Sequence, residues 1–396
     1  MQRRDFIKKG GAVSAALVVS SSVLGSISYG INTDRKINIG IIGTGVRGKG
    51  LLKTINTIDN MDVVACCDTI PFHLDESLKL TNGLAIGYSD YHELLKDKNV
   101  DAVLVTAPFY LHTQISIAAL DAGKHVYCEK TLAKGYEGIN TLVSKVKNSD
   151  RIFQVGHQYH SSRLYTHVVE LLKEGKVGTI SAFECQWNRH GDWRRSVSKP
   201  DLERQINWRM YKEYSGGLLA ELSSHQIEFV NWVLDAHPEK VTGFGGVNYW
   251  KDGRETYDNI HVMYSYPDGV KASFICLTTN ANEGYQIKVL GDKGTLLIDY
   301  DTAWFYPEGS KKIVNTDVDG VSGATAKFKY QNGEEIKVSH LDPSKQALVD
   351  FKTSILNNKQ PESNVYTGAR AAVCIQMGLD AMYNNEIVNW NPGFDI

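Results

Sequence analysis

The sequence lacks an excess of charge of either sign. Its 43 Lys and Arg residues nearly balance its 45 Asp and Glu residues, which gives a formal net charge of -2. The two signs are interspersed, so no basic stripe is present that could follow a phosphate backbone. Nucleic acid is therefore not an expected partner, and a small, roughly neutral molecule fits the composition better.

Cysteine is scarce, and it lacks the close paired spacing of a metal knuckle. The six cysteines lie mostly in apolar runs typical of buried strands or helices: Cys66, Cys67, Cys128, Cys185, Cys276 and Cys374. We expect them to be buried thiols. A disulfide framework is not expected to hold this fold.

A long, strongly apolar run is also missing. Residues 1–30 begin with Arg3 and Arg4 in "RRDFIKK" and continue with an uncharged, mildly apolar segment that contains many Gly and Ser residues. This segment is too weakly apolar to predict a stable membrane span, and it favours a signal peptide that is removed. "RRDFIKK" resembles the twin-arginine motif of proteins that are exported already folded, which predicts a periplasmic protein. A frayed cytoplasmic terminus is the alternative.

What is present is a chain of 396 residues, 42% hydrophobic and 22% charged, as in soluble globular proteins with two domains. In residues 34–155, strand-like runs such as "INIGII" and "DAVLVTA" alternate with segments whose apolar residues recur at three and four positions. This alternation predicts a doubly wound parallel sheet. In residues 156–396, closely spaced strand-like runs with Gly turns predict a second α/β domain whose sheet is largely antiparallel.

The segment "GTGVRG" follows the first predicted strand and begins a predicted helix. Gly43 permits a tight turn, Gly45 lets the backbone approach a pyrophosphate, and Gly48 allows close packing of the helix. Asp68 ends the second predicted strand, 20 residues beyond Gly48. A carboxylate at this point can bind both ribose hydroxyls and repel a 2'-phosphate, so the pattern favours NAD over NADP. A glycine turn with a surface aspartate is the alternative.

Further candidates follow the later strands of this domain. Pro108 comes after "DAVLVTA", His112 lies on the next predicted helix, and Glu129 and Lys130 end the following strand. Ligands of open parallel sheets bind at the carboxyl ends of the strands, so we expect Lys130 to face the nicotinamide end of the cofactor. There it can donate a hydrogen bond or relay a proton. A solvated Glu-Lys pair is the alternative.

A third group lies in "SGGLLAELSSHQIEF". Glu221, His225 and Glu228 are spaced by four and three residues, so they share one face of a predicted helix. Glu221 beside His225 is expected to raise the pKa of the imidazole and fix its tautomer, as a general base for an alcohol requires. An ion pair or an interface histidine is one alternative. A metal site is another, but no further ligands are identifiable and we expect none.

The order of "GIIGTGVRG", "TAPFYLH", "AGKHVYCEK" and "GGLLAELSSHQIE" resembles the glucose-fructose oxidoreductase / inositol dehydrogenase (Gfo/Idh/MocA) family. The resemblance implies an N-terminal Rossmann domain and a C-terminal α/β domain with an open sheet that carries substrate and subunit contacts. It also implies NAD(P)-dependent chemistry on sugars or cyclitols and a homo-oligomer. Two positions depart from the family pattern. Thr131 stands where proline is usual, and Glu221 stands where aspartate is usual.

The resemblance and the motifs together assign candidate roles. Lys130, Glu221 and His225 are the expected catalytic residues. The residues expected to bind NAD are Gly43, Thr44, Gly45, Val46, Arg47, Gly48, Asp68, Pro108, His112, Glu129 and Lys130. The residues expected to contact the substrate are His157, Gln158 and Tyr159, together with Trp193 and Arg194 of a loop rich in Trp and Arg. A packed domain or subunit contact is the alternative for that loop.

These features predict an exported oxidoreductase that oxidises a ring hydroxyl of a sugar or glycoside, C3 by analogy, with tightly bound NAD. Folding around NAD before export would supply the cofactor outside the cytoplasm. One rival is an NAD-dependent glycosidase that works by transient oxidation and elimination, with Tyr159, His157 or Lys130 as a further acid or base. The other rival is a sugar-binding protein without catalytic activity.

Overall fold

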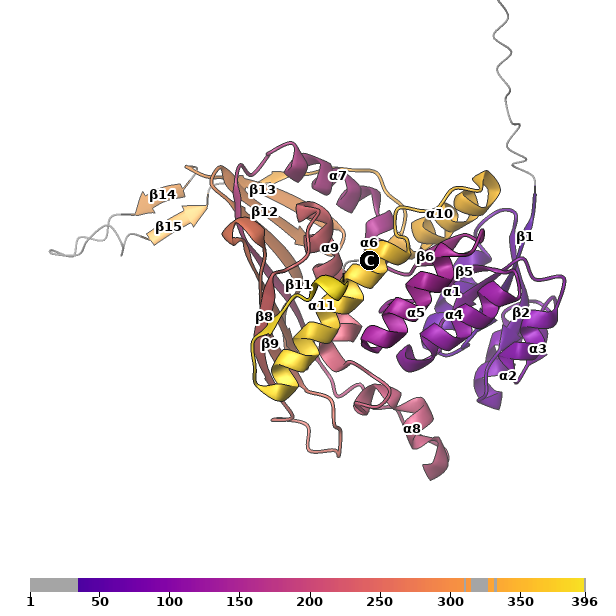
Figure 1. Cartoon of the computed structure of the whole chain (residues 1–396). Coiled ribbons are helices and arrows are strands. Elements are labelled where there is room, and N and C mark those ends of the chain that lie inside the picture. Colours follow the sequence, from indigo (N-terminus) through magenta and orange to yellow (C-terminus); the bar gives the residue numbers. More distant parts are fainter. Residues whose placement is uncertain (1–34, 310, 315–326, 331–332, 395–396) are drawn as a thin grey trace, which may run out of the picture. The chain divides into compact units, whose positions relative to one another are not determined.

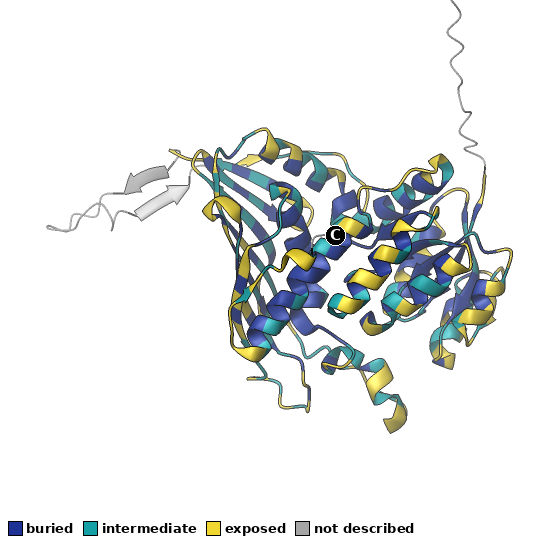
Figure 2. Ribbon diagram, viewed as in Figure 1, coloured by how far each residue is buried: buried dark blue, intermediate teal, exposed yellow. Residues whose placement is uncertain are grey.

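The first sheet consists of six parallel strands in the order β3-β2-β1-β4-β5-β6. The computed structural model describes residues 35–309, 311–314, 327–330 and 333–394, so the expected signal peptide lies outside the described residues. The strands are β1 (Ile37–Ile42), β2 (Met61–Cys67), β3 (Ile86–Tyr88), β4 (Ala102–Val105), β5 (His125–Cys128) and β6 (Phe153–Val155). Buried residues make up nearly all of β1, β4 and β6, as is typical of a sheet covered on both faces (Figure 2). The predicted doubly wound parallel sheet is confirmed.

Helices connect these strands, and their apolar residues explain how they pack. The helices are α1 (Val46–Ile55), α2 (Pro71–Lys79), α3 (Tyr91–Lys96), α4 (His112–Asp121) and α5 (Gly135–Lys147). On α5, buried Ile139, Leu142, Val143 and Val146 recur at three and four positions and so form one face. The sequence pattern missed β3, because two of its three residues are exposed and leave no apolar run.

One helix from late in the chain also covers the first sheet. Helix α10 (Pro343–Asn357) places the ring of Phe351 5.8 Å from that of Tyr127, measured between centroids, and the Ala347 carbonyl accepts a 2.8 Å bond from Gln154 Nε2. Its apolar residues belong to the same buried cluster as those of β1 and α1. The nucleotide-binding half of the fold is therefore completed by residues about 190 positions beyond β6.

The second sheet has nine strands in the order β16-β13-β12-β11-β7-β10-β9-β8-β17, and all its pairings are antiparallel except β7 with β10. The strands are β7 (Ile180–His190), β8 (Lys240–Gly246), β9 (Asn259–Ser265), β10 (Lys271–Leu277), β11 (Thr279–Gly291), β12 (Gly294–Asp299), β13 (Thr302–Pro307), β16 (Glu334–Glu335) and β17 (Val388–Asn389). Two further strands, β14 (Lys311–Val314) and β15 (Lys327–Tyr330), form a separate hairpin. The largely antiparallel second sheet is also confirmed.

Helices cover one face of the second sheet (Figure 1). They are α7 (Arg163–Lys173), α9 (Ser224–Leu234) and α11 (Val365–Asn384), and a π-helical segment, Leu219–Ser223, precedes α9. Two short helices are not part of this layer: α6 (Gln158–Ser161) packs on α10, and α8 (Glu203–Ile206) projects away from the sheet (Figure 1). Gln226 Nε2 on α9 donates to the Gln186 carbonyl on β7, and Tyr264 on β9 donates to the Cys374 carbonyl on α11. These bonds fix both helices to the sheet.

All six cysteines are buried and free, as predicted.

Over the part of the chain that the structure describes, no helix combines the length and apolarity needed to cross a membrane.

Candidate active site

The glycine loop lies between β1 and α1, and its glycines serve different purposes. Gly43 has φ of +95°, and a Cβ there would lie 2.5 Å from the Ala107 nitrogen; a Cβ at Gly48 would lie 2.2 Å from the Gly43 carbonyl oxygen. A Cβ at Gly45 would meet no described atom within 4 Å. Gly43 and Gly48 are therefore required by packing, whereas Gly45 leaves open space at the helix start. With no side-chain cap and no acidic residue in its first turn, this N-terminus is suited to a phosphate.

Asp68 follows β2 and lies beside the glycine loop. Its Oδ2 accepts a 2.8 Å bond from the Thr44 backbone N–H, and its Oδ1 accepts a 2.9 Å bond from the Ile70 N–H. These bonds hold the carboxylate at the carboxyl end of the sheet, where it can also accept from ribose hydroxyls. The open backbone at Gly45 and the fixed carboxylate of Asp68 fit NAD.

An ion pair joins the loop to the end of β5. Arg47 Nε lies 2.8 Å from Glu129 Oε1, and one Arg47 terminal nitrogen donates to Ser344 at 3.1 Å. The other, Nη2, is buried and has no hydrogen-bond partner among the described residues. Val46, by contrast, is 63% exposed at the loop surface. The guanidinium of Arg47 is thus fixed at the boundary between the predicted cofactor site and the pocket described below.

His112 connects two backbone segments at the edge of the site. Pro108 leads into the short 3-10 turn Phe109–Leu111, which places His112 at the start of α4. Its Nδ1 lies 2.8 Å from the Thr131 carbonyl oxygen and its Nε2 lies 3.0 Å from the Ala107 carbonyl oxygen. Burial lowers the pKa of His112. With both nitrogens occupied by backbone, His112 holds the segment after β4 against the segment that carries Lys130.

Lys130 reaches from the end of β5 to the π-helical segment. Its Nζ donates a 2.7 Å bond to the Glu221 carbonyl oxygen, and Thr131 Oγ1 donates a 3.0 Å bond to the Ala220 carbonyl oxygen. The peptide bond between Lys130 and Thr131 is cis. Burial lowers the pKa of Lys130, and the negative charges of Glu221 and Glu129 partly offset this effect. Two adjacent side chains thus use backbone carbonyls of a π-helical segment, a form of helix found often at functional sites.

Glu221 contacts an arginine. Arg209 Nε lies 2.7 Å from Glu221 Oε2, and the Glu221 side chain is 11% exposed. The pKa of His225 is lowered well below its usual value by burial, then by the positive charge of Lys130 and by His157. The expectation that Glu221 raises the pKa of His225 is therefore wrong, because the carboxylate is already bound by Arg209. His225 is instead held neutral.

Glu228, the third residue of the predicted face, is bound elsewhere. Its Oε1 contacts Nδ1 of His160, whose ring stacks on Trp232 with centroids 3.9 Å apart. Within the described ranges, no group of three His, Cys, Asp or Glu side chains is placed to hold a metal ion.

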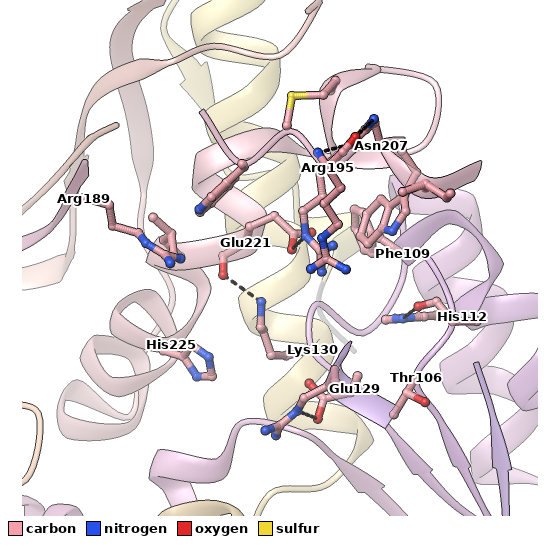
Figure 3. Close-up of a pocket in the computed structure, with 18 of the residues that line it drawn as sticks. Thr106, Phe109, His112, Glu129, Lys130, Arg189, Arg195, Asn207, Glu221 and His225 are labelled. Carbon is pink, nitrogen blue, oxygen red and sulfur yellow. Dashed lines mark hydrogen bonds and ion pairs between the residues drawn. The ribbon is translucent and has the colours of Figure 1, made fainter. Parts of the chain in front are cut away.

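The side chains of Lys130 and His225 line one pocket of about 360 Å³ (Figure 3). One wall consists of residues from the helices and strand ends of the nucleotide-binding half of the fold: Arg47, Thr106, Ala107, Phe109, His112, Glu129 and Lys130. The other wall is formed by Gln158, Trp187, Arg189, Trp193, Arg195, Ile206, Asn207, Trp208, Arg209, Met210, Glu221, Leu222 and His225. A neutral imidazole, a half-buried ammonium group and aromatic side chains therefore meet at the carboxyl end of a nucleotide-binding sheet.

Comparison with known protein families separates the same two parts of the chain. The model described as "Oxidoreductase family, NAD-binding Rossmann fold" matches residues 37–157, and the model of the Gfo/Idh/MocA C-terminal domain matches residues 165–297. The 2,7-anhydro-N-acetylneuraminate hydratase of Escherichia coli (strain K12) is 30% identical over 268 residues, which are 66% of this chain and 68% of that protein. The chain belongs to the Gfo/Idh/MocA family.

Other members are similar over more of the chain. Myo-inositol 2-dehydrogenase of Thermotoga maritima is 26% identical over 349 residues, 87% of this chain and 95% of that protein. Levoglucosan dehydrogenase in complex with NADH and levoglucosan has a TM-score of 0.71 at 18% identity, and covers 90% of this chain and 99% of its own. Aldose-aldose oxidoreductase of Caulobacter crescentus has a TM-score of 0.72 at 18% identity, with 90% and 100% coverage. At such identities the structural likeness establishes the fold alone. NAD is the cofactor of this Gfo/Idh/MocA chain.

Of the three residues after β6 that were expected to contact substrate, Gln158 lines the pocket. His157 and Tyr159 lie behind His225, with ring centroids 5.8 Å and 5.0 Å from its imidazole. His157 is buried, and neither of its ring nitrogens has a hydrogen-bond partner within the described part of the chain. His157 and Tyr159 thus contact His225, the candidate general base. Of the three residues, Gln158 alone lines the pocket.

Of the two candidate substrate-binding residues in the Trp- and Arg-rich loop, one lines the pocket and the other does not. Trp193 lines the pocket, whereas Arg194 does not: its guanidinium pairs with Glu203 and, at 3.2 Å, with Asp252. The lining residues that the sequence analysis did not single out include Arg195 and Arg209. The density of Arg and Trp in this loop was a signal for the region as a whole, but it did not distinguish Arg195, which faces the pocket, from its neighbour.

Proposed function

We propose that this protein is an NAD-dependent dehydrogenase that oxidises a ring hydroxyl of a sugar or glycoside, at C3. The observation that carries the proposal is the presence of neutral His225 and half-buried Lys130 in one pocket at the carboxyl end of the NAD-binding sheet. The dehydrogenase relatives named above act on an inositol and on levoglucosan, which supports a polyhydroxylated substrate.

The side chains handle the proton of the reacting hydroxyl. His225 accepts it, because the lowered pKa keeps the imidazole unprotonated at neutral pH. The positive charge of Lys130 stabilises the negative charge that develops on the substrate oxygen. When bound, NAD supplies the acceptor for the hydride from the same carbon. The aromatic side chains of Trp187, Trp193 and Trp208 offer flat apolar faces to the ring of a sugar.

A redox-neutral reaction is the second candidate. In this scheme the oxidised substrate loses its aglycone by elimination, adds water and is reduced again, so the NAD is regenerated in each cycle. The presence of Lys130 beside His225 in the pocket favours it, because elimination needs a further acid or base that can reach the substrate. The E. coli relative is named as a hydratase, which is consistent with such chemistry.

Export is part of the proposal. "RRDFIKK" at residues 3–9 is the support for a twin-arginine signal, and a nucleotide held from the cytoplasm onward would serve the enzyme in the periplasm. Replacing Arg3 and Arg4 by Lys should retain the protein in the cytoplasmic fraction. Unchanged periplasmic recovery of the double variant would refute this route. We also propose a homo-oligomer, to be tested by light scattering of the purified protein.

The test of the activity uses protein purified without added cofactor. The nucleotide released by denaturation is identified, and the native protein is mixed with a panel of sugars, cyclitols and aryl glycosides. Reduced nicotinamide that persists until an acceptor is added supports the dehydrogenase. Aglycone released over many turnovers without lasting reduction supports the redox-neutral scheme. Sugar binding with neither signal would leave only a binding protein.

A further inference from the structure

The pocket has more positive than negative side chains. The cationic lining residues are Arg47, Lys130, Arg189, Arg195 and Arg209, and the acidic ones are Glu129 and Glu221. Both acids are already paired, Glu129 with Arg47 and Glu221 with Arg209. Lys130, Arg189 and Arg195 therefore remain without a partner carboxylate in the pocket. This local excess contrasts with the near-neutral charge of the whole chain.

Arg195 is the most distinctive of these cations. The Asn207 side chain accepts from the Arg195 N–H at 2.8 Å and donates to its carbonyl oxygen at 2.9 Å, which fixes the backbone of the loop at this residue. The guanidinium has no ion-pair or hydrogen-bond partner among the residues that the structure describes, and Figure 3 shows it directed into the pocket, with Arg189 farther along the same wall. Partial burial and the charge of Arg209 lower the pKa of Arg195.

Arginines of the same region that face away from the pocket are neutralised. Arg194 pairs with Glu203 and Asp252, and Arg254 pairs with Asp252. Arg204 lies 3.6 Å from both Glu213 and Glu255. Acidic residues in this region thus pair with the other arginines, but none of them forms an ion pair with Arg195. Arg195 and Arg189 are both accessible to solvent, and an anion bound at this pocket reduces the repulsion among its positive charges.

The anion is not explained by the cofactor phosphates. The glycines that would receive a pyrophosphate, Gly43, Gly45 and Gly48, are not among the described residues that line this pocket. Arg47, which lies between the loop and the pocket, is paired with Glu129. The unpaired guanidinium of Arg195 belongs to the other wall, together with Trp193 and Trp208.

We propose that the substrate is a sugar that carries a carboxylate, either a free sugar acid or a glycoside of a uronic acid, and that Arg195 binds this carboxylate. The inference rests on the proposed function, whose substrate class it specifies. A guanidinium matches a carboxylate by two parallel hydrogen bonds, which lysine cannot reproduce. Arg189, whose guanidinium carbon lies 5.2 Å from the centroid of the Trp193 ring, adds a second positive charge to the same wall.

The test compares matched ligands that differ only in charge, methyl β-glucoside with methyl β-glucuronide and galactose with galacturonate. Binding to the NAD-loaded protein is measured by calorimetry at two salt concentrations, and turnover is measured separately. Arg195→Gln and Arg195→Lys are compared with Arg204→Gln, which removes the same charge from an exposed residue outside the pocket.

We expect at least one acid to bind about tenfold more tightly than its neutral partner, with weaker binding at high salt. Arg195→Gln should remove this preference, Arg195→Lys should restore only part of it, and Arg204→Gln should leave it intact. The inference is overturned if the acid and the neutral ligand bind equally in both pairs, or if neither acid binds. It is also overturned if Arg195→Gln weakens the binding of acid and neutral ligands equally. An acid that binds selectively but is never converted refutes the proposed activity alone, whereas conversion of neutral sugars only refutes the substrate class alone.

Discussion

The pair formed by Glu221 and Arg209 allows a prediction that separates structural support from catalysis. The carboxylate accepts from Arg209 Nε at 2.7 Å, and the two side chains are 11% and 32% exposed. In the Glu221→Gln variant, the guanidinium of Arg209 loses its carboxylate partner and can donate only to the neutral amide oxygen of Gln. Because the charged groups around His225 are Lys130, His157 and Arg47, this substitution should leave the protonation of His225 unchanged.

The magnitude follows from the exposure of the pair. Exposed pairs contribute up to about 1 kcal/mol, and breaking a fully buried pair costs about 3–5 kcal/mol. With one partner a third exposed, we expect Glu221→Gln to lower the free energy of unfolding by about 2 kcal/mol. For a chain of 396 residues this corresponds to a decrease in Tm of about 2 °C.

The assay is a double-mutant cycle of Glu221→Gln and Arg209→Gln, followed by thermal unfolding and by the pH profile of kcat/KM. The cycle should give a coupling energy of about 1–2 kcal/mol. The acid limb of the profile should stay at the wild-type pH even though the rate falls. A coupling energy near zero would show that the pair does not stabilise the fold. A shifted acid limb would show that Glu221 acts on His225 after all.

The remaining predictions concern the pocket and the cofactor. Burial and the charge of Lys130 lower the pKa of His225, so activity should persist as the pH falls below 6.5 and disappear only at the lowered pKa. Lys130→Met should raise the pKa of His225 and move the acid limb of kcat/KM to higher pH. An acid limb at the wild-type pH would contradict the coupling between Lys130 and His225. Gly45→Val should fold, because its side chain meets open space, yet lose NAD in a fluorescence titration, whereas Gly48→Ala should lower the melting temperature itself. If Gly45→Val binds NAD normally, the open space at this glycine is not the phosphate site. Asp68→Ala should reduce the preference for NAD over NADP, measured as the ratio of the two Kd values, and an unchanged ratio would exclude a ribose contact.

Local sequence patterns were sufficient to predict much of the fold. Alternating apolar runs and the spacing from Gly43 to Asp68 predict the parallel sheet and its glycine loop, because neighbouring residues determine strands, turns and helix starts. Helix α10 could be predicted as a helix, but its position on the first sheet could not. That position depends on contacts such as Phe351 with Tyr127, which are more than 200 residues apart.

The candidate site shows the same limit. Lys130 and His225 could be located from their motifs, and the structure places both in one pocket. The partner of Glu221 could not be predicted, because helical spacing favours His225 at i+4 while the structure provides Arg209 from the 3-10 turn Trp208–Met210. The π-helical segment Leu219–Ser223 adds to the difficulty, since its geometry departs from the regular helix that the spacing assumed.

Proton removal by His225 is the central step of the proposed NAD-dependent oxidation. The most direct measurement is a single turnover of NAD-loaded protein with a substrate from the panel, followed through the absorbance of reduced nicotinamide in wild type and in His225→Asn. The account predicts reduction in wild type and a rate lower by about a hundredfold or more in the variant, with equal NAD content in the two proteins. Equal rates of reduction in both proteins would contradict it.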